Sequence, residues 1–99
     1  MATEFHCITV ISERLLKDDL VQLMKKEGAK GFSITDSEGE GSRGVNASDW
    51  EGRNVKIESI VHGDTARRLM ELISDQYFED YAVIAYSYPV TVVREDKFK

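Results

Sequence analysis

The chain has 99 residues, a formal net charge of -5, 41% hydrophobic residues and 31% charged residues. This composition is typical of one small globular domain, and without a run of eighteen apolar residues it predicts no membrane-spanning segment. Basic residues form only short pairs such as Lys25–Lys26, so no basic face is expected that could neutralise the phosphates of a nucleic acid. We therefore predict no nucleic-acid partner.

The first ten residues contain neither a basic segment nor a long apolar segment, so no secretory signal is predicted. Cys7 is the single cysteine and cannot form an intrachain disulfide, which favours a reduced, cytoplasmic setting. The two histidines, His6 and His62, are too widely separated in the sequence to predict a zinc site with Cys7. Cys7 is expected to be a small buried residue of a strand.

Residues 4–12 are rich in β-branched and aromatic side chains and are predicted to form the first strand. Leucines then recur at spacings of four and three residues, which is the pattern of an amphipathic helix over about 13–27. Ser12 is the predicted N-cap of this helix, and Gly28 is its predicted end.

A second strand is predicted over 30–37, where Phe32 and Ile34 alternate with polar residues. The same alternation predicts a third strand over 54–61. The polar, glycine-rich stretch between them, about 38–53, is far longer than the two to five residues of a usual hairpin loop. Loops of this length are commonly functional or disordered.

Apolar residues lie on one helical face of residues 62–78, which predicts a second amphipathic helix with Asp64 or Thr65 as its cap. A long apolar and β-branched run over 81–93 predicts the last strand. Pro89 restricts the second half of this strand to a sheet edge or a bend, because proline lacks the N–H group that a central strand must donate.

The predicted order β-α-β-β-α-β is that of the ferredoxin-like α+β fold, in which two helices cover one face of a four-stranded antiparallel sheet. We expect one domain over 1–99, with a flexible loop over about 38–53 and a mobile charged tail over about 94–99.

Both phases of the first and last strands are apolar. One phase, expected on one face of the sheet, contains Ile8, Val10, Ile84, Tyr86 and Tyr88. The opposite phase contains Cys7, Ile11, Val83 and Ala85. Because the helices cover only one face, the other face is expected to bury itself against a partner subunit. A symmetric oligomer follows.

The long loop carries a glycine motif. Gly39, Gly41 and Gly44 have the spacing G-x-G-x-x-G, but a strand follows where a dinucleotide-binding unit needs a helix, which excludes a Rossmann site. Glycine amides can still approach an anion closely, and Ser42 and Arg43 add a hydroxyl and a guanidinium suited to phosphate or carboxylate. A solvated loop without a ligand is the alternative.

The segment "EGAKGFSITDSEGEGSRG", followed by "NVKIESIV", resembles the second strand, T-loop and third strand of the PII signalling family, and the same order of elements runs through residues 4–94. "GAKGFSI", "GEGSRG" and "YFEDYAVIAY" are most similar to its carbon-sensing branch, the carboxysome-associated and bicarbonate-transporter-associated PII-like proteins. The resemblance implies a homotrimer that binds adenine nucleotides in clefts between subunits, with the T-loop closing over the phosphates.

The resemblance also implies which residues bind each ligand. Ser33 is expected to meet the adenine with its hydroxyl group, and Ile11 and Ile60 to line the base. Gly39 and Gly41 match the glycines that lie against the phosphates, and Ser42 and Arg43 match the positions that follow. The carbon-sensing relatives also suggest bicarbonate as a second ligand. An anion beside a nucleotide phosphate needs a nearby cation, and Arg43 is the first candidate, with Arg53 or Lys56 behind it.

The chain departs from the nitrogen-regulatory members in four places. Their T-G-x-x-G-x-G-K segment is replaced by "QYFEDY", and of the arginine pair on their last strand only Arg94 lies nearby. The uridylylated tyrosine has no counterpart, and Asn54 replaces the lysine used for 2-oxoglutarate. We therefore expect AMP or ADP to be favoured over ATP, with no 2-oxoglutarate sensing and no uridylylation.

The leading interpretation is a ligand-sensing regulator that is not an enzyme. Nucleotide and bicarbonate would order the loop and change what Trp50, a candidate partner contact, presents to a bicarbonate transporter or another carbon-uptake protein. The alternative is a slow nucleotide phosphohydrolase that uses Asp36, Glu38 and Glu40, although ordinary loop solubility also explains these acids. A metal-responsive trimer of the same fold is a third hypothesis, which the single cysteine disfavours.

Overall fold

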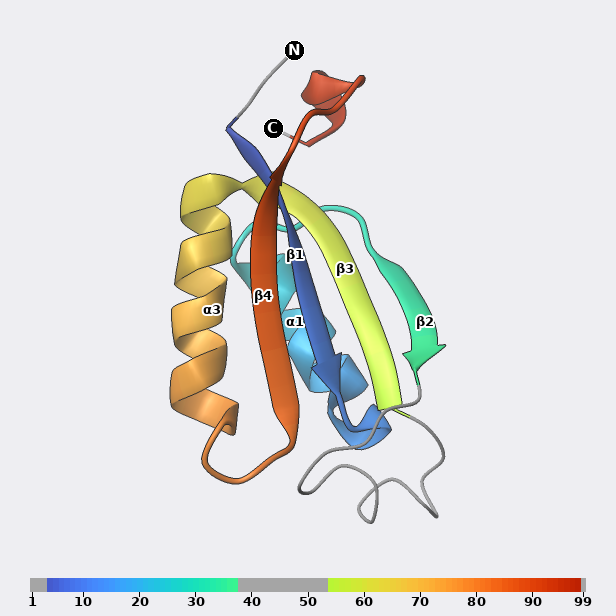
Figure 1. Ribbon diagram of the computed structural model, residues 1–99, viewed down its shortest axis with the longest axis vertical. Helices are drawn as coiled ribbons and strands as arrows, with labels where there is room; N and C mark the ends of the chain where they lie inside the picture. Colours follow the sequence, from blue (N-terminus) through green and yellow to red (C-terminus); the bar gives the residue numbers. More distant parts are fainter. Residues whose placement is uncertain (1–3, 38–53, 99) are drawn as a thin grey trace.

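The computed structural model describes residues 4–37 and 54–98, which form a four-stranded antiparallel sheet with two helices on one face (Figure 1). The predicted α+β architecture is thereby confirmed. The described helices and strands are β1 (Phe5–Ser12), α1 (Lys17–Lys26), β2 (Ser33–Ser37), β3 (Asn54–His62), α3 (Gly63–Tyr77) and β4 (Val83–Val90), with 3-10 turns η1 (Arg14–Leu16) and η2 (Glu95–Lys97). Neither described helix is long and apolar enough to cross a bilayer.

Both predicted helix starts are wrong. Ser12 Oγ donates to the carbonyl oxygen of its neighbour Glu13 at 3.0 Å, and α1 begins only after η1, with Leu16 at the N-cap. The second helix, α3, has His62 at its N-cap and begins at Gly63, so the predicted caps lie inside its first turn. Neither N-cap side chain hydrogen-bonds a free amide of its helix. The 3-10 turn η1 leads into α1, whereas α3 follows β3 directly from the extended residue His62.

The predicted end of the first helix is confirmed. Gly28 has a φ of 115°, a left-handed conformation that glycine adopts without a Cβ penalty. Its N–H donates to the Lys25 carbonyl at 3.1 Å, and the N–H of Ala29 donates to the Met24 carbonyl at 3.0 Å. This pair of bonds is a Schellman motif, which satisfies carbonyls that the helix end leaves free.

The core lies between the helices and the sheet face that they cover. β1 lies at the centre, in the order β2-β3-β1-β4, and pairs with β3 and β4 along its whole length. Fully buried side chains from both layers fill this space: Ile8, Val10, Val55, Ile57, Leu20, Met24, Leu69 and Ile73. Burying one such side chain contributes about 1.5–3 kcal/mol, so this layer supplies most of the driving force for folding.

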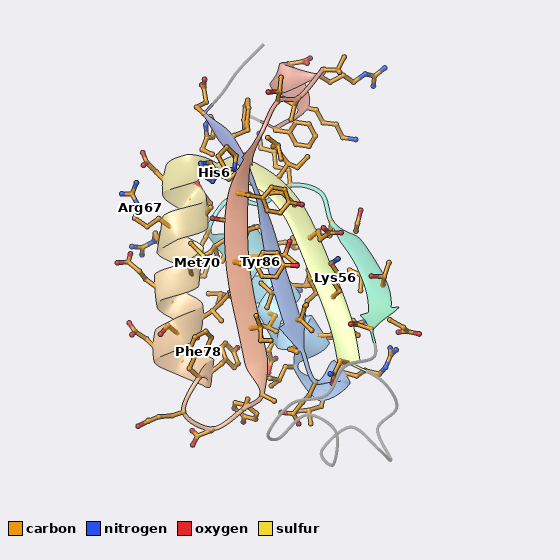
Figure 2. The ribbon with its side chains drawn as sticks, in the orientation of Figure 1. His6, Lys56, Arg67, Met70, Phe78 and Tyr86 are labelled. Carbon is orange, nitrogen blue, oxygen red and sulfur yellow. The ribbon has the colours of Figure 1, made fainter. Side chains whose placement is uncertain are left out.

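The opposite sheet face carries exposed apolar side chains. The register pairs Tyr88 with Cys7, Tyr86 with Thr9 and Ile84 with Ile11, all on the face away from the helices. The sequence grouping of Ile84, Tyr86 and Tyr88 with the core residues of β1 is therefore wrong, although the predicted uncovered apolar face is present. Figure 2 shows Tyr86 in front of the sheet, with α1 behind it.

The last strand ends earlier than predicted. β4 spans Val83–Val90 and is an edge strand, which confirms the placement expected from Pro89. The segment after it forms the turn η2, and the Phe98 ring lies edge-on to the Phe5 ring, with 6.2 Å between centroids. The predicted mobility of this tail stays a prediction.

A buried carboxylate holds the connection between α3 and β4. Glu13 is only 6% exposed, and its Oε2 accepts a hydrogen bond from the backbone N–H of Ala82 at 3.1 Å. The two residues are 69 positions apart, so this contact ties the end of β1 to the start of β4. Hydrogen bonds to charged groups contribute about 1.5–3 kcal/mol each, more than most neutral bonds.

We expect Glu13→Ala to lower the free energy of unfolding by about 1–3 kcal/mol, because it leaves the Ala82 N–H without its buried acceptor. Urea unfolding followed by circular dichroism measures this loss. Glu13→Gln keeps an acceptor oxygen and should recover part of it. The control Asp75→Asn changes an exposed carboxylate of α3 and should leave the midpoint unchanged. A midpoint for Glu13→Ala equal to that of the control would contradict the assigned role.

Candidate functional site

An open cavity of about 420 Å³ lies on the sheet face that the helices leave uncovered. It is lined by residues of β1, β3, the α1–β2 connection, β2 and the tail: Cys7, Gly31, Phe32, Ser33, Glu58, Ser59, Ile60, Lys97 and Phe98. Ser33 and Ile60, both expected at the adenine, are among them. Its size is in the range of small-ligand pockets.

The cavity wall combines apolar surfaces with a few polar groups. Phe32, Ile60 and Phe98 supply apolar surface, and the exposed Ser33 supplies a hydroxyl group. Ser59 Oγ donates to the Gly31 carbonyl oxygen at 2.6 Å, so this hydroxyl fixes the turn before β2. An apolar pocket with few oriented polar groups suits a flat organic ring with a hydrogen-bonding edge.

Cys7 closes the floor of the cavity and is buried, as predicted. Its Sγ donates weakly to Glu58 Oε2 at 3.9 Å and lies 3.9 Å from Thr9 Oγ1. Glu58 and Lys97 are the ionisable side chains of opposite charge among the described lining residues. The opposite charges of Glu58 and Lys97 therefore add up to zero at the cavity wall.

The other two described site candidates lie at a different place. Ile11 and Lys56 face each other across β1 and β3, close to the residue where β3 begins. Lys56 and Ile60 are four residues apart on one face of β3, which is about 14 Å at strand geometry. Ile11 and Lys56 therefore do not line the cavity of this chain. Figure 2 labels Lys56 beside β3.

The remaining predicted site residues lie outside the described part of the chain. They are Gly39, Gly41, Ser42, Arg43, Trp50 and Arg53, together with Glu38 and Glu40 of the alternative enzymatic hypothesis. The structure thus brings Ser33 and Ile60 together and places Ile11 beside Lys56. The roles assigned to all of these residues stay predictions.

Asp36, the remaining carboxylate of the phosphohydrolase hypothesis, forms an ion pair with Arg14 of η1. The sequence reasoning did not single out Arg14, because a lone arginine after a strand has no motif. The pair joins the end of β2 to the turn before α1, so the Asp36 carboxylate already has a cationic partner within the chain. Within 4–37 and 54–98, no group of three histidine, cysteine or acidic side chains could hold a metal ion.

A second cavity lies where α3 begins. Its lining includes His6, His62, Arg67 and Met70, and Figure 2 shows His6 and Arg67 on neighbouring elements. His6 Nδ1 is buried without a hydrogen-bond partner in the described structure, and a Cβ on Gly63 would lie 3.0 Å from His6 Cδ2. The close contact explains why glycine starts α3. The predicted ligand residues do not lie here.

Comparison with known proteins identifies the family. The model of the family described as nitrogen regulatory protein P-II matches residues 5–97, and the chain belongs to this family. A PII-like protein from Thermus thermophilus is 44% identical, with 96% of this chain and 95% of that chain covered and a TM-score of 0.84.

Two more distant structures share the fold. CPII from Thiomonas intermedia K12, bound to ADP and bicarbonate, is 22% identical, with 99% of this chain and 100% of that chain covered and a TM-score of 0.81. The GlnK–ATP complex of B. subtilis is 14% identical, with 89% and 84% covered and a TM-score of 0.58.

Tyr88 gives a direct probe of the cavity floor. A hydrogen bond with Cys7 is the main cause that raises the pKa of the Tyr88 phenol above its ordinary value of 10.0, followed by the charge on Cys7, burial and the charge on Glu58. Because the folded chain favours the neutral phenol, the resulting stabilisation is complete below pH 10 and is lost as the pH rises through the folded pKa.

We expect Cys7→Ala to lower the pKa of Tyr88 toward 10.0, because it removes the largest cause of the shift. Ultraviolet absorbance of the phenolate during alkaline titration measures this, with Tyr88→Phe identifying the Tyr88 component. The same variant should leave the raised pKa of Tyr77 on α3 unchanged, because burial and not Cys7 is its main cause. An unaltered Tyr88 midpoint in Cys7→Ala would show that the sulfur does not govern this phenol.

Proposed function

We propose that this chain is a PII-like regulatory protein that binds AMP or ADP, and bicarbonate, and is not an enzyme. The observation that carries the proposal is the open-face cavity that contains Ser33 and Ile60, the described positions expected to meet adenine. Family membership supports a regulatory role. Related structures of CPII contain ADP, AMP and bicarbonate, which supports this choice of ligands.

The arrangement of the described residues suggests how a nucleotide would lie. The base would occupy the cavity, and the phosphates would extend along β3 toward Lys56 and the long loop. There Gly39, Gly41, Ser42 and Arg43 would bind the phosphates. Ile11, opposite Lys56, would then line the cleft at its phosphate end rather than in the cavity itself.

Bicarbonate would bind beside the phosphates. Arg43 is its first candidate ligand, with Arg53 or Lys56 behind it, because an anion next to a phosphate needs a cation between the two charges. The "QYFEDY" segment supplies no glycine or lysine for a third phosphate, so AMP and ADP are favoured and ATP is a weaker candidate.

The assembly would be a homotrimer with its ligands in clefts between subunits. Ile84 is 59% exposed, Tyr86 40% and Tyr88 46%, and all three lie on the uncovered sheet face. An apolar surface of this kind is stabilised when a second copy covers it. The cavity opens on the same face, so a neighbouring subunit would complete its wall.

The signal would be an ordering of the T-loop at about 38–53. Bound nucleotide and bicarbonate would fix this loop and so change the surface around Trp50 that a partner contacts. The carbon-sensing resemblance favours a membrane transporter for bicarbonate, or another protein of a carboxysome-linked carbon concentrating mechanism, as that partner. The setting of this exchange would be the cytoplasm.

Calorimetric titration of AMP, ADP and ATP, each with and without bicarbonate, tests the ligands. We expect AMP and ADP to bind, and bicarbonate to tighten one of them about 5- to 150-fold, which corresponds to a coupling of about 1–3 kcal/mol. Each ligand must change the affinity of the other by the same factor. Absence of binding for all three nucleotides would refute the proposed function, and equal affinities in both buffers would remove bicarbonate from it.

In the same titrations, Arg43→Ala should lower the affinity for nucleotide and the affinity for bicarbonate together.

Light scattering during size-exclusion chromatography tests the trimer. We expect the wild-type protein to elute as a trimer and Ile84→Asp as a monomer, because a carboxylate at this position would be buried without a partner. Leu15→Asp is the matched control, since Leu15 is 50% exposed and belongs to η1, outside the sheet. A monomeric wild type, or a trimeric Ile84→Asp, would show that this face is not the interface.

A further inference from the structure

The C-terminal tail forms part of the candidate nucleotide cavity. Lys97 and Phe98 line it together with Ser33 and Ile60, although they follow the last strand and belong to no recognised motif. The tail turns back here through η2, where the N–H of Lys97 donates to the Arg94 carbonyl at 3.2 Å. This turn carries Phe98 onto the uncovered face of the sheet.

The Phe98 ring packs against the ring of the buried residue Phe5 on β1. It meets the ring of Phe5 edge-on, with 6.2 Å between centroids and 63° between planes. Phe5 is fully buried, and the His62 ring lies 4.8 Å from it on a neighbouring strand. The Lys97 ammonium lies 5.9 Å from the Phe98 centroid, which adds a cation–π contact to the same ring. These contacts hold an aromatic side chain at the cavity wall.

The lining around Phe98 matches the chemistry of a purine. A nucleobase has two flat apolar faces, and aromatic side chains bind such faces by stacking. Phe32 and Ile60 add apolar wall, while the Ser33 hydroxyl and the Glu58 carboxylate supply groups for the polar edge of the ring. The cavity therefore offers a stacking surface in addition to hydrogen-bonding partners.

We propose that Phe98 stacks on the base of the bound adenine nucleotide and so sets the preference of the site for a purine. The inference rests on the proposed nucleotide-binding function and adds to it a residue from the tail. Phe98 acts on the base and makes no contact with the phosphates. Its removal therefore weakens a complete nucleotide but not the sugar phosphate alone.

The test compares AMP with ribose 5-phosphate, by calorimetry, on the wild-type protein and on Phe98→Ala. Loss of a base–aromatic stack corresponds to about 5- to 150-fold weaker binding. We expect AMP affinity to fall by this factor and ribose 5-phosphate affinity to stay constant. Phe98→Trp should restore AMP binding, because indole offers a larger stacking face. Phe78→Ala, which truncates a ring that is 46% exposed at the end of α3, is the matched control and should bind AMP as the wild type does.

Phe98→Leu keeps apolar volume against Phe5 and serves if Phe98→Ala does not fold, as judged by its thermal melt and oligomer size. It should still lose most of the stacking. If these variants bind AMP as tightly as the wild type, with the same ratio of AMP affinity to ribose 5-phosphate affinity, the role of Phe98 is overturned. The proposed function then stays intact. Tighter AMP binding would also overturn it and would show that the ring occupies the base site. No nucleotide binding by the wild type would overturn both proposals.

Discussion

The register of the central strand β1 is the constraint on which the rest of the structure depends. β1 pairs with β3 and β4 without a break, so every residue of three strands is assigned to one face or the other. One face carries the core beneath α1 and α3, and the other carries the candidate cavity and the exposed Ile84, Tyr86 and Tyr88. A slip of one residue would exchange these two surfaces, because side chains alternate along a strand.

The sequence was informative wherever periodicity or composition decides the outcome. The spacing of the leucines predicted α1, alternation predicted β2 and β3, and Gly28 marked the helix end that its positive φ confirms. The helix starts could not be predicted in the same way. Ser12 is a good N-cap residue, but the chain makes a 3-10 turn first, and His62 precedes a glycine that packs against His6. Contacts between distant segments override such local preferences.

The same limit applies to the candidate site. Resemblance to the PII family selected Ser33 and Ile60, and the fold brings both to one cavity. Nothing in the order of residues indicated that the tail would return to this cavity, or that Arg14 would pair with Asp36. Both contacts join segments far apart in the chain. Their residues carry no motif, and a charged tail is ordinarily interpreted as solvated. Predicting these contacts requires knowing which distant segments the folded chain brings together, and the sequence pattern alone does not contain this.

The two outer strands of the sheet have a consequence for how copies of this chain can associate. β2 is short and carries serine, threonine and aspartate, while β4 carries Pro89, which has no N–H to donate to an added strand. Short, polar and proline-containing edges are poor templates for continuing a sheet from one molecule to the next. The chain therefore resists open-ended, amyloid-like growth through its strand edges. The proposed trimer would use the exposed apolar face of the sheet instead, and a closed trimer leaves no interface free for further growth.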